Sequence, residues 1–324
     1  MVSNSAPSRL TTIVRHLKDK GQALRDGGLD RSNANQIGLL PSKGWQTRNY
    51  RFLRNVVIPS IFAPRSGESI ISAPASSMQS RLTWIGHATY LLQIDGKNIL
   101  IDPNWAMWHG IFKRVRQPGL RLEDLPKIDL VLVSHAHQDH LHLKSLEQFA
   151  NGQPILMPHG CSRIVRRLNL EPIEMKWWDG FHFEGLDLTF TPAKHWGARF
   201  VHDVHRGFGG FIIKGAERTI FHCGDSAAFD GFAEIGSRFD IDLALMPIGA
   251  YDAPSGREVH MNPEQALEAF VTLGAERMAP MHYGSFPLGG EPMHEPLERL
   301  IVHAGRLGLL HRVDVIKEGP PLFL

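Results

Sequence analysis

The sequence predicts an α/β fold in which two β-sheets pack together and helices cover the outside. The first observation is that β-rich runs separated by turns begin abruptly at Arg81. The second is a nearly continuous apolar run over residues 128–134, which is typical of a strand buried on both faces. The third is that strand and helix patterns alternate from there to Met281, which favours layered sheets with helices outside them.

The β-rich runs after Arg81 predict the start of a β-meander. They are rich in the branched and aromatic residues that strands favour, and Gly86 and the turn at residues 95–97 separate them. The three runs cover residues 82–85, 89–94 and 98–101. The apolar strand at 128–134 then leads directly into a cluster of histidines.

Beyond that cluster the sequence predicts a strand at 154–157 between helices at 144–150 and 161–168. A further helix at 263–273 is indicated by Asn262 as its N-cap and Pro263 at its first position. The remaining strands are expected over residues 186–191, 209–214, 218–223, 243–248 and 277–281. No repeat of fixed period occurs in the sequence.

Residues 1–80 show none of these patterns and predict an N-terminal extension that wraps a single domain formed by residues 81–324. The extension is irregular, polar and Gly-rich apart from a short apolar run at 56–62. For residues 1–40 a partly disordered tail is the alternative.

Composition excludes several classes of protein. The formal net charge is +2 over 324 residues without a long run of Lys or Arg, so nothing indicates a nucleic-acid partner. Two cysteines, Cys161 and Cys223, are too few for a disulfide scaffold. No signal peptide or membrane-spanning run is found, so we expect a soluble, cytoplasmic protein. The 18 histidines make metal ligation by imidazole the first chemistry to test.

Four potential metal ligands lie within six residues where the apolar strand ends. In an extended segment, side chains two residues apart point to one side, and the following turn brings the next two toward the same space. Imidazole and carboxylate are ligands that zinc prefers, with one position left open for water. The four are His135, His137, Asp139 and His140.

Three later residues have the same context, a ligand type just beyond an apolar strand. They are His195, Asp225 and His282. Each alone is equally compatible with a loop histidine or a turn aspartate. Together with the first four they make two metal shells.

These motifs resemble those of the metallo-β-lactamase superfamily, and most of all its branch containing N-acyl-phosphatidylethanolamine phospholipase D and the ascorbate-phosphate lactonases. The resemblance extends from about Arg81 to Arg299 and departs at Gln138, commonly aromatic or small, and at Gly197, often Ser. The sequence motifs that carry the resemblance are residues 84–89 (Trp-Ile-Gly-His-Ala-Thr), 191–196, 209–211, 246–251, 260–266 and 282–288. The resemblance implies a four-layer αββα sandwich whose catalytic domain follows the N-terminal extension.

The resemblance also implies the ligand assignment of a dinuclear zinc hydrolase. One zinc ion would be held by His135, His137 and His195, the other by Asp139, His140 and His282, with Asp225 bridging them. A hydroxide shared by two zinc ions is the expected nucleophile, and Asp139 would also orient its proton. Manganese or iron suits the same donors.

His260 is the second catalytic candidate, because the family histidine in that loop faces the active site. We expect it to bind a phosphate oxygen or to protonate the leaving alkoxide. The alternative is that it stabilises its own loop. His87 is expected to be mainly structural, and the alternative is that it contacts a metal ligand. Asp95 and Asp102 are expected to be turn residues, and for Asp102 contact with a metal ligand is again the alternative.

The function expected from these features is hydrolysis of a small-molecule or lipid-like phosphodiester. A lactonase or ester hydrolase acting on a soluble substrate is the alternative, and a metal-binding protein without catalysis is a third reading. A redox role is disfavoured, because the di-iron branch of the superfamily usually has a carboxylate where His137 stands. The apolar run 56–62 and the segment with Trp105, Trp108 and Phe112 either pack on the core or form a peripheral membrane contact. The oligomeric state stays open.

Overall fold

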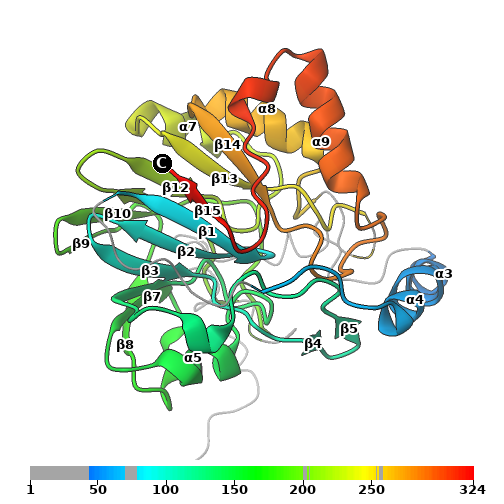
Figure 1. Ribbon diagram of the computed structural model, residues 1–324, viewed down its shortest axis with the longest axis horizontal. Coiled ribbons are helices and arrows are strands. Elements are labelled where there is room, and N and C mark those ends of the chain that lie inside the picture. The colour runs from blue at the N-terminus through cyan, green and yellow to red at the C-terminus, as the bar shows by residue number, and fades with distance from the viewer. Residues whose placement is uncertain (1–43, 70–78, 200–202, 204, 253, 255–257) are drawn as a thin grey trace, which may run out of the picture.

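The computed structural model describes residues 44–69, 79–199, 203, 205–252, 254 and 258–324. These residues form two β-sheets packed face to face with helices on both outer sides, the four-layer arrangement that the sequence predicts (Figure 1). The tail expected over residues 1–40 lies outside the described residues.

The first sheet has seven strands in the order β15-β1-β2-β3-β6-β7-β8. Strands β1 to β3 are the antiparallel meander, and β3, β6, β7 and β8 run parallel. Their bounds are β1 Arg81–Gly86, β2 Thr89–Ile94, β3 Lys97–Ile101, β6 Leu130–Leu132, β7 Pro154–Pro158, β8 Glu171–Met175 and β15 Pro321–Phe323. The connections between the parallel strands contain the short helices α5 (Leu143–Phe149) and α6 (Ser162–Val165).

The second sheet has six strands in the order β14-β13-β12-β11-β10-β9. Strands β12 to β14 are parallel, whereas β9 to β12 alternate in direction. Their bounds are β9 Gly180–Phe183, β10 Leu186–Thr191, β11 Gly210–Lys214, β12 Thr219–His222, β13 Leu243–Pro247 and β14 Arg277–Met281. Its helices are α7 (Gly231–Arg238), α8 (Pro263–Leu273) and α9 (Glu295–Arg306).

Helix α8 begins as the sequence predicts. The Asn262 side chain accepts a hydrogen bond from the Gln265 amide at 2.9 Å, and the Gln265 side chain accepts one from the Asn262 amide, which completes a capping box. Gly274 ends the helix in a left-handed conformation. Local sequence therefore sets both ends of this helix.

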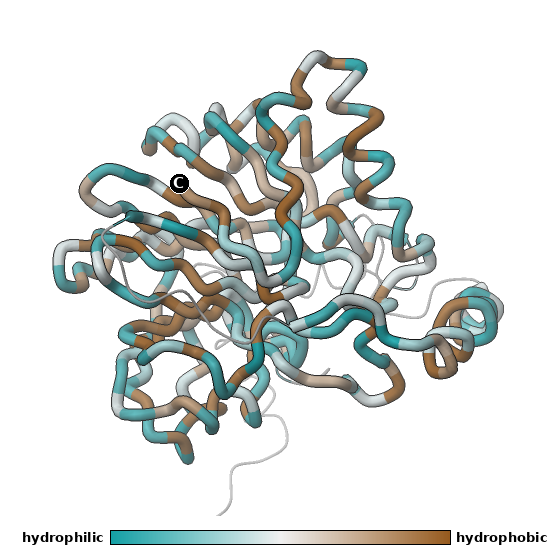
Figure 2. The backbone as a smooth tube through the Cα atoms, viewed as in Figure 1, coloured by the Kyte–Doolittle hydropathy of each residue, from teal (hydrophilic) through white to brown (hydrophobic). Residues whose placement is uncertain are grey.

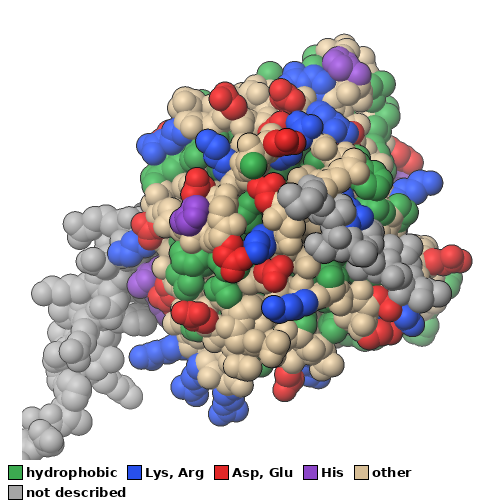
Figure 3. Space-filling view, turned by 60° about the vertical axis from the view of Figure 1, so that its left-hand side comes forward, with side chains coloured by type: hydrophobic (Ala, Val, Ile, Leu, Met, Phe, Trp, Pro, Cys, Tyr) green, Lys and Arg blue, Asp and Glu red, His purple; other side chains and the backbone are tan. Residues whose placement is uncertain are grey.

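The main hydrophobic core lies between the two sheets, where apolar residues concentrate along the strands (Figure 2). It includes Leu92 and Ile99 from the first sheet and Phe190, Phe211 and Phe221 from the second. A second cluster, with Val131 and Ile155, fills the space under α5 and α6. On the face shown in Figure 3, acidic and basic side chains are interspersed.

The segment before the first sheet is more regular than predicted. Residues of the expected irregular extension form α3 (Trp45–Phe52), a π-helical turn (Leu53–Val57) and α4 (Ile58–Phe62). Pro59 suggests a break, but the residues before it keep helical backbone angles, and the π-helical turn directly before α4 lets the helical path continue to Phe62. This helix lies beside the hairpin of β4 (Trp108–His109) and β5 (Phe112–Lys113), with the Phe52 and Phe112 ring centroids 6.1 Å apart.

Several other elements were absent from the prediction or longer in it. Strand β8 contains Pro172 and lies at a sheet edge, where proline is tolerated but the strand pattern is lost. Strands β9 and β15 and helices α7 and α9 were not predicted, and α6 is shorter than the expected helix. Among the described residues, no helix is long and apolar enough to cross a membrane.

Candidate metal centre

Every predicted ligand follows the carboxyl end of a strand. The cluster 135–140 follows β6, His195 follows β10, Asp225 follows β12 and His282 follows β14. Strands β10 and β12 run in the same direction because both are antiparallel to β11, and β14 runs parallel to them through β13. Loops distant in sequence therefore meet at one edge of the sandwich.

Left-handed backbone conformations at three positions direct side chains into this space. Gly224, with φ 63°, turns the chain so that Asp225 follows at once, and it packs against Ser134. His87 and His282 adopt φ 58° and 59°, and the His282 amide donates to the His87 carbonyl at 3.0 Å. Such conformations in non-glycine residues are costly and cluster at functional sites.

One group of donors comprises His135, His137, His195 and Asp225, with ligand atoms all within 4.8 Å of one another. The His135 Nε2 and His137 Nδ1 atoms are 2.8 Å apart, and His195 Nε2 lies 3.3 Å from the same His137 nitrogen. Two loops, one from each sheet, thus contribute imidazoles to a single small space.

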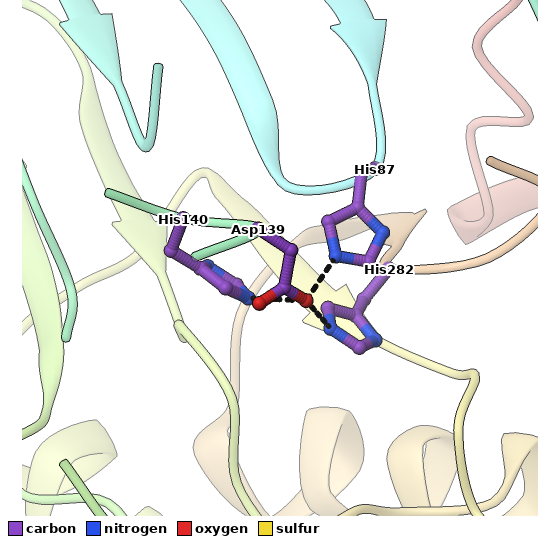
Figure 4. A group of neighbouring side chains, drawn as sticks. All are labelled: His87, Asp139, His140 and His282. Carbon is purple, nitrogen blue, oxygen red and sulfur yellow. Dashed lines mark hydrogen bonds and ion pairs between the residues drawn. The ribbon is translucent and has the colours of Figure 1, made fainter. Parts of the chain in front are cut away.

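The second group comprises His87, Asp139, His140 and His282 (Figure 4). The Asp139 carboxylate points between the three imidazoles, with its Oδ2 atom 2.9 Å from His87 Nε2. The same oxygen lies 3.7 Å from both His140 Nε2 and His282 Nε2. This group contains one imidazole, His87, that the resemblance did not assign to a metal.

Asp225 lies between the two groups. Its Oδ2 atom is 3.8 Å from His135 Nε2 and 3.7 Å from His195 Nε2 on one side. On the other side it is 3.3 Å from His140 Nε2 and 3.1 Å from His282 Nε2. A carboxylate in this position has the geometry needed to serve two cations at once.

The donor atoms fit metal ions. Several are buried and have no hydrogen-bond partner in the part of the chain that the structure describes, which is costly for polar atoms unless another group binds them. These atoms are His137 Nε2, His140 Nε2, His282 Nε2 and Asp225 Oδ1. The residues present can therefore hold metal ions.

Charge divides the imidazoles into two kinds. Burial lowers the pKa of His137 to about 3 and that of His195 to about 4, so both rings are neutral with a lone pair free for a cation. Burial has the same direction at His282, but Asp225 and Asp139 outweigh it and raise its pKa to about 9. The negative charge that attracts this proton equally attracts a metal cation.

Two residues that the sequence left as mainly structural or turn residues contact the candidate ligands directly. The Asp102 carboxylate is 2.7 Å from His140 Nδ1 and accepts from the Ser134 hydroxyl at 2.6 Å. His87 contacts Asp139, as described above. Both therefore follow the alternative considered for them, since they orient residues of the centre. Asp95, in contrast, is a turn residue that accepts from the Ala216 amide.

A cavity of about 490 Å³ opens beside these groups. His260 lines it, with Nδ1 3.8 Å from Asp225 Oδ2. The sequence therefore placed this histidine in the right neighbourhood, and its catalytic role stays a prediction. Gln138, Trp196 and Arg199 also line the cavity; sequence reasoning gave no sign of Arg199.

Gly197, one of the two departures from the family pattern, has a structural reason. A Cβ atom there would lie 2.3 Å from the Gly207 carbonyl oxygen and 2.4 Å from that of Arg206. The close approach of the segment at residues 206–207 therefore excludes a serine at this position without a backbone shift.

Comparison with known proteins agrees with this architecture. The model of the β-lactamase superfamily domain matches residues 97–283, more than half of the chain. The chain belongs to the metallo-β-lactamase superfamily. The fold and the resemblance predicted from the motifs are thereby confirmed.

Individual members of the superfamily cover most of this chain. It is 32% identical over 241 residues to N-acyl-phosphatidylethanolamine-hydrolyzing phospholipase D 1 of Caenorhabditis elegans, covering 67% of this chain and 68% of that protein. It is 30% identical over 244 residues to a metal-dependent hydrolase of Methanopyrus kandleri, covering 74% and 97%. The structure of a metallo hydrolase from Ignicoccus hospitalis superposes with a TM-score of 0.59 at 26% identity, covering 76% and 98%. The family and the fold are those of metal-dependent hydrolases.

Proposed function

We propose that this protein is a dinuclear zinc phosphodiesterase that cleaves a lipid-like phosphodiester. The observation that carries the proposal is the position of Asp225, whose carboxylate lies within 4 Å of imidazoles from both donor groups beside an open cavity. The likeness to the phospholipase D of C. elegans supports the choice of a phosphodiester.

The seven predicted ligands would be divided between two ions. His135, His137 and His195 would hold one, Asp139, His140 and His282 the other, and Asp225 would contact both. When bound, two zinc ions would supply a water-derived nucleophile near neutral pH and polarise the bond under attack. Imidazole and carboxylate donors with no thiolate also accept manganese or iron, so zinc is part of the proposal.

Two side chains have roles beyond metal binding in this proposal. Asp139 lines the cavity and is held by His87, so its carboxylate can accept the proton of the attacking water. His260 lines the same cavity, where a ring N–H can donate a hydrogen bond to an oxygen of the substrate or the leaving group.

A peripheral contact with a lipid surface belongs to the same proposal. The helix from α3 to α4 and the adjacent β4–β5 hairpin expose large apolar side chains, of which Phe62 is 81% exposed. The others are Tyr50, Leu53, Ile58, Trp108 and Ile111. Residues 45–62 contain three arginines and no acidic residue, which complements anionic headgroups. The hairpin also lines the cavity through His109, Gly110 and Phe112, so such a surface would lie next to the site.

The proposal is tested by metal content and by hydrolysis before and after chelation. The purified protein should contain close to two zinc ions and cleave bis-p-nitrophenyl phosphate in a chelator-sensitive reaction. Hydrolysis of lactones or carboxylic esters alone would favour the ester hydrolase instead. Bound metal without turnover of either substrate would favour a non-catalytic protein. Flotation with anionic liposomes, compared with Phe62→Ser, tests the lipid surface.

A further inference from the structure

Arg199 is the cationic side chain of the cavity. Among the described residues that line this space it is the only Lys or Arg, and Asp139, Asp225 and His282 belong to the candidate metal centre. Arg199 follows the loop that carries His195 and is partly buried. A positive side chain at this position is not explained by the metal ligands.

The guanidinium is fixed against the loop that carries four of the candidate ligands. Its Nη1 atom donates to the Ala136 carbonyl at 3.0 Å and to the Leu141 carbonyl at 2.9 Å. The Ala136 residue directly follows the first candidate ligand of that loop, His135, and Leu141 directly follows the last, His140. These two hydrogen bonds therefore hold the Arg199 guanidinium beside the candidate metal centre rather than extended into solvent.

One edge of the guanidinium has no hydrogen-bond partner among the residues that the structure describes. Arginine has five N–H donors in a planar fork, and both hydrogen bonds described above come from one nitrogen. In the described part of the chain Arg199 forms no ion pair within 4 Å of a carboxylate, whereas neighbouring Arg206 pairs with Asp203 at 2.7 Å. Burial lowers the pKa of Arg199, but a guanidinium remains charged at neutral pH. A fixed, partly desolvated cation whose remaining donors have no partner in the described residues attracts an anion from the cavity.

We propose that Arg199 binds a non-bridging oxygen of an anionic phosphodiester and so selects phosphodiesters over neutral esters and lactones at this metal centre. The inference rests on the proposed function and deepens it, since it names the group that distinguishes the two substrate classes. A phosphodiester carries a full negative charge over two oxygens before reaction, and the planar fork of arginine matches that arrangement. A neutral ester presents no such charge in its ground state.

The test compares two substrates that share a leaving group. We would measure kcat/KM of the metal-loaded protein for bis-p-nitrophenyl phosphate and for p-nitrophenyl acetate, in wild type, Arg199→Gln and Arg199→Lys. Arg199→Gln should shift the ratio of the two values toward the ester by roughly 10-fold to 100-fold, as expected for loss of a charged hydrogen bond. Arg199→Lys, which keeps the charge without the fork, should lie between. Equal losses on both substrates would show that Arg199 only holds the loop and would overturn the inference.

Binding of diethyl phosphate, a phosphodiester anion, separates this inference from the proposed function. Calorimetry on the metal-loaded protein should show binding that weakens at least about 10-fold in Arg199→Gln. Wild type that binds diethyl phosphate through Arg199 but cleaves no phosphodiester would contradict the proposed function alone. Equal binding by both proteins would contradict the role of Arg199 alone. If Arg199→Gln fails to retain metal, the same comparison with Arg199→Lys decides the outcome.

Discussion

The two sheets contribute to the candidate metal centre in different ways. The first sheet supplies four candidate ligands from one loop, residues 135–140, directly after β6. The second sheet supplies one ligand from each of three loops, His195 after β10, Asp225 after β12 and His282 after β14. The first contribution depends on spacing within a few residues, whereas the second depends on the order and direction of strands.

This difference shows how the two donor groups depend on the fold. Each group combines residues from both sheets, since His137 meets His195 and Asp139 meets His282. Neither sheet can therefore supply a complete donor group by itself. The centre should be lost when the sheets separate, and single substitutions on either sheet should have comparable effects within one group.

The largest effect is expected at Asp225, because its carboxylate lies between both groups. Asp225→Ala should remove both ions and lower hydrolysis by about 100-fold or more, since even outer partners of ligands contribute 10-fold to 100-fold. Metal analysis and chelator-sensitive turnover measure this. Retention of two ions would show that Asp225 does not join the groups.

His137→Ala and His195→Ala test whether residues from the two sheets form one group. Each should lose one of two ions and leave the other, with closely similar loss of activity, because both imidazoles belong to the same set of donors. Titration of the metal-free variants with zinc counts the remaining sites. A clear difference between the two variants in the number of remaining metal sites would show that His137 and His195 do not belong to one donor group.

Asp102→Asn tests whether the Asp102 carboxylate orients His140 in the ligand loop of the first sheet, residues 135–140. The substitution weakens the carboxylate that orients His140, and we expect metal affinity to fall roughly 10-fold to 100-fold. The matched control is Asp95→Asn, the same change at another left-handed turn residue away from the centre. Competition with a chelator measures both affinities, and an equal response at the two positions would rule out the orienting role.

The smallest effect is expected for Gly274→Ala, which tests whether stability can change on the side of the second sheet without a change in metal binding. Gly274 ends α8 with φ 73° and no atom lies within 4 Å of an added Cβ, so Gly274→Ala introduces backbone strain without a clash. We expect a loss of about 1 kcal/mol in the free energy of unfolding. Urea denaturation measures it, while zinc content should not change. Loss of zinc in this variant would mean that the centre responds to general stability.

Much of this fold could be predicted because local patterns were strong. Strand β14 and helix α8 have the bounds expected from apolar runs and from the Asn262 cap. The helix at residues 45–62 was missed, because polar residues and Pro59 conceal it and its stability comes from packing against the β4–β5 hairpin. The edge strand β8 was missed for the related reason that its pairing partner, rather than its own pattern, defines it.

By itself, the sequence predicted which side chains are candidate metal ligands, from the spacing within residues 135–140 and from the strand-end context of His195, Asp225 and His282. The family resemblance implied how these residues are grouped, but only the tertiary structure shows them together, because parallel strands remote in sequence must align before Asp225 can approach both sets of imidazoles. The tertiary structure also revealed the contact of Asp102 with His140 and the position of Arg199 in the cavity. Such contacts join distant segments through packing and hydrogen bonds, which no local pattern records.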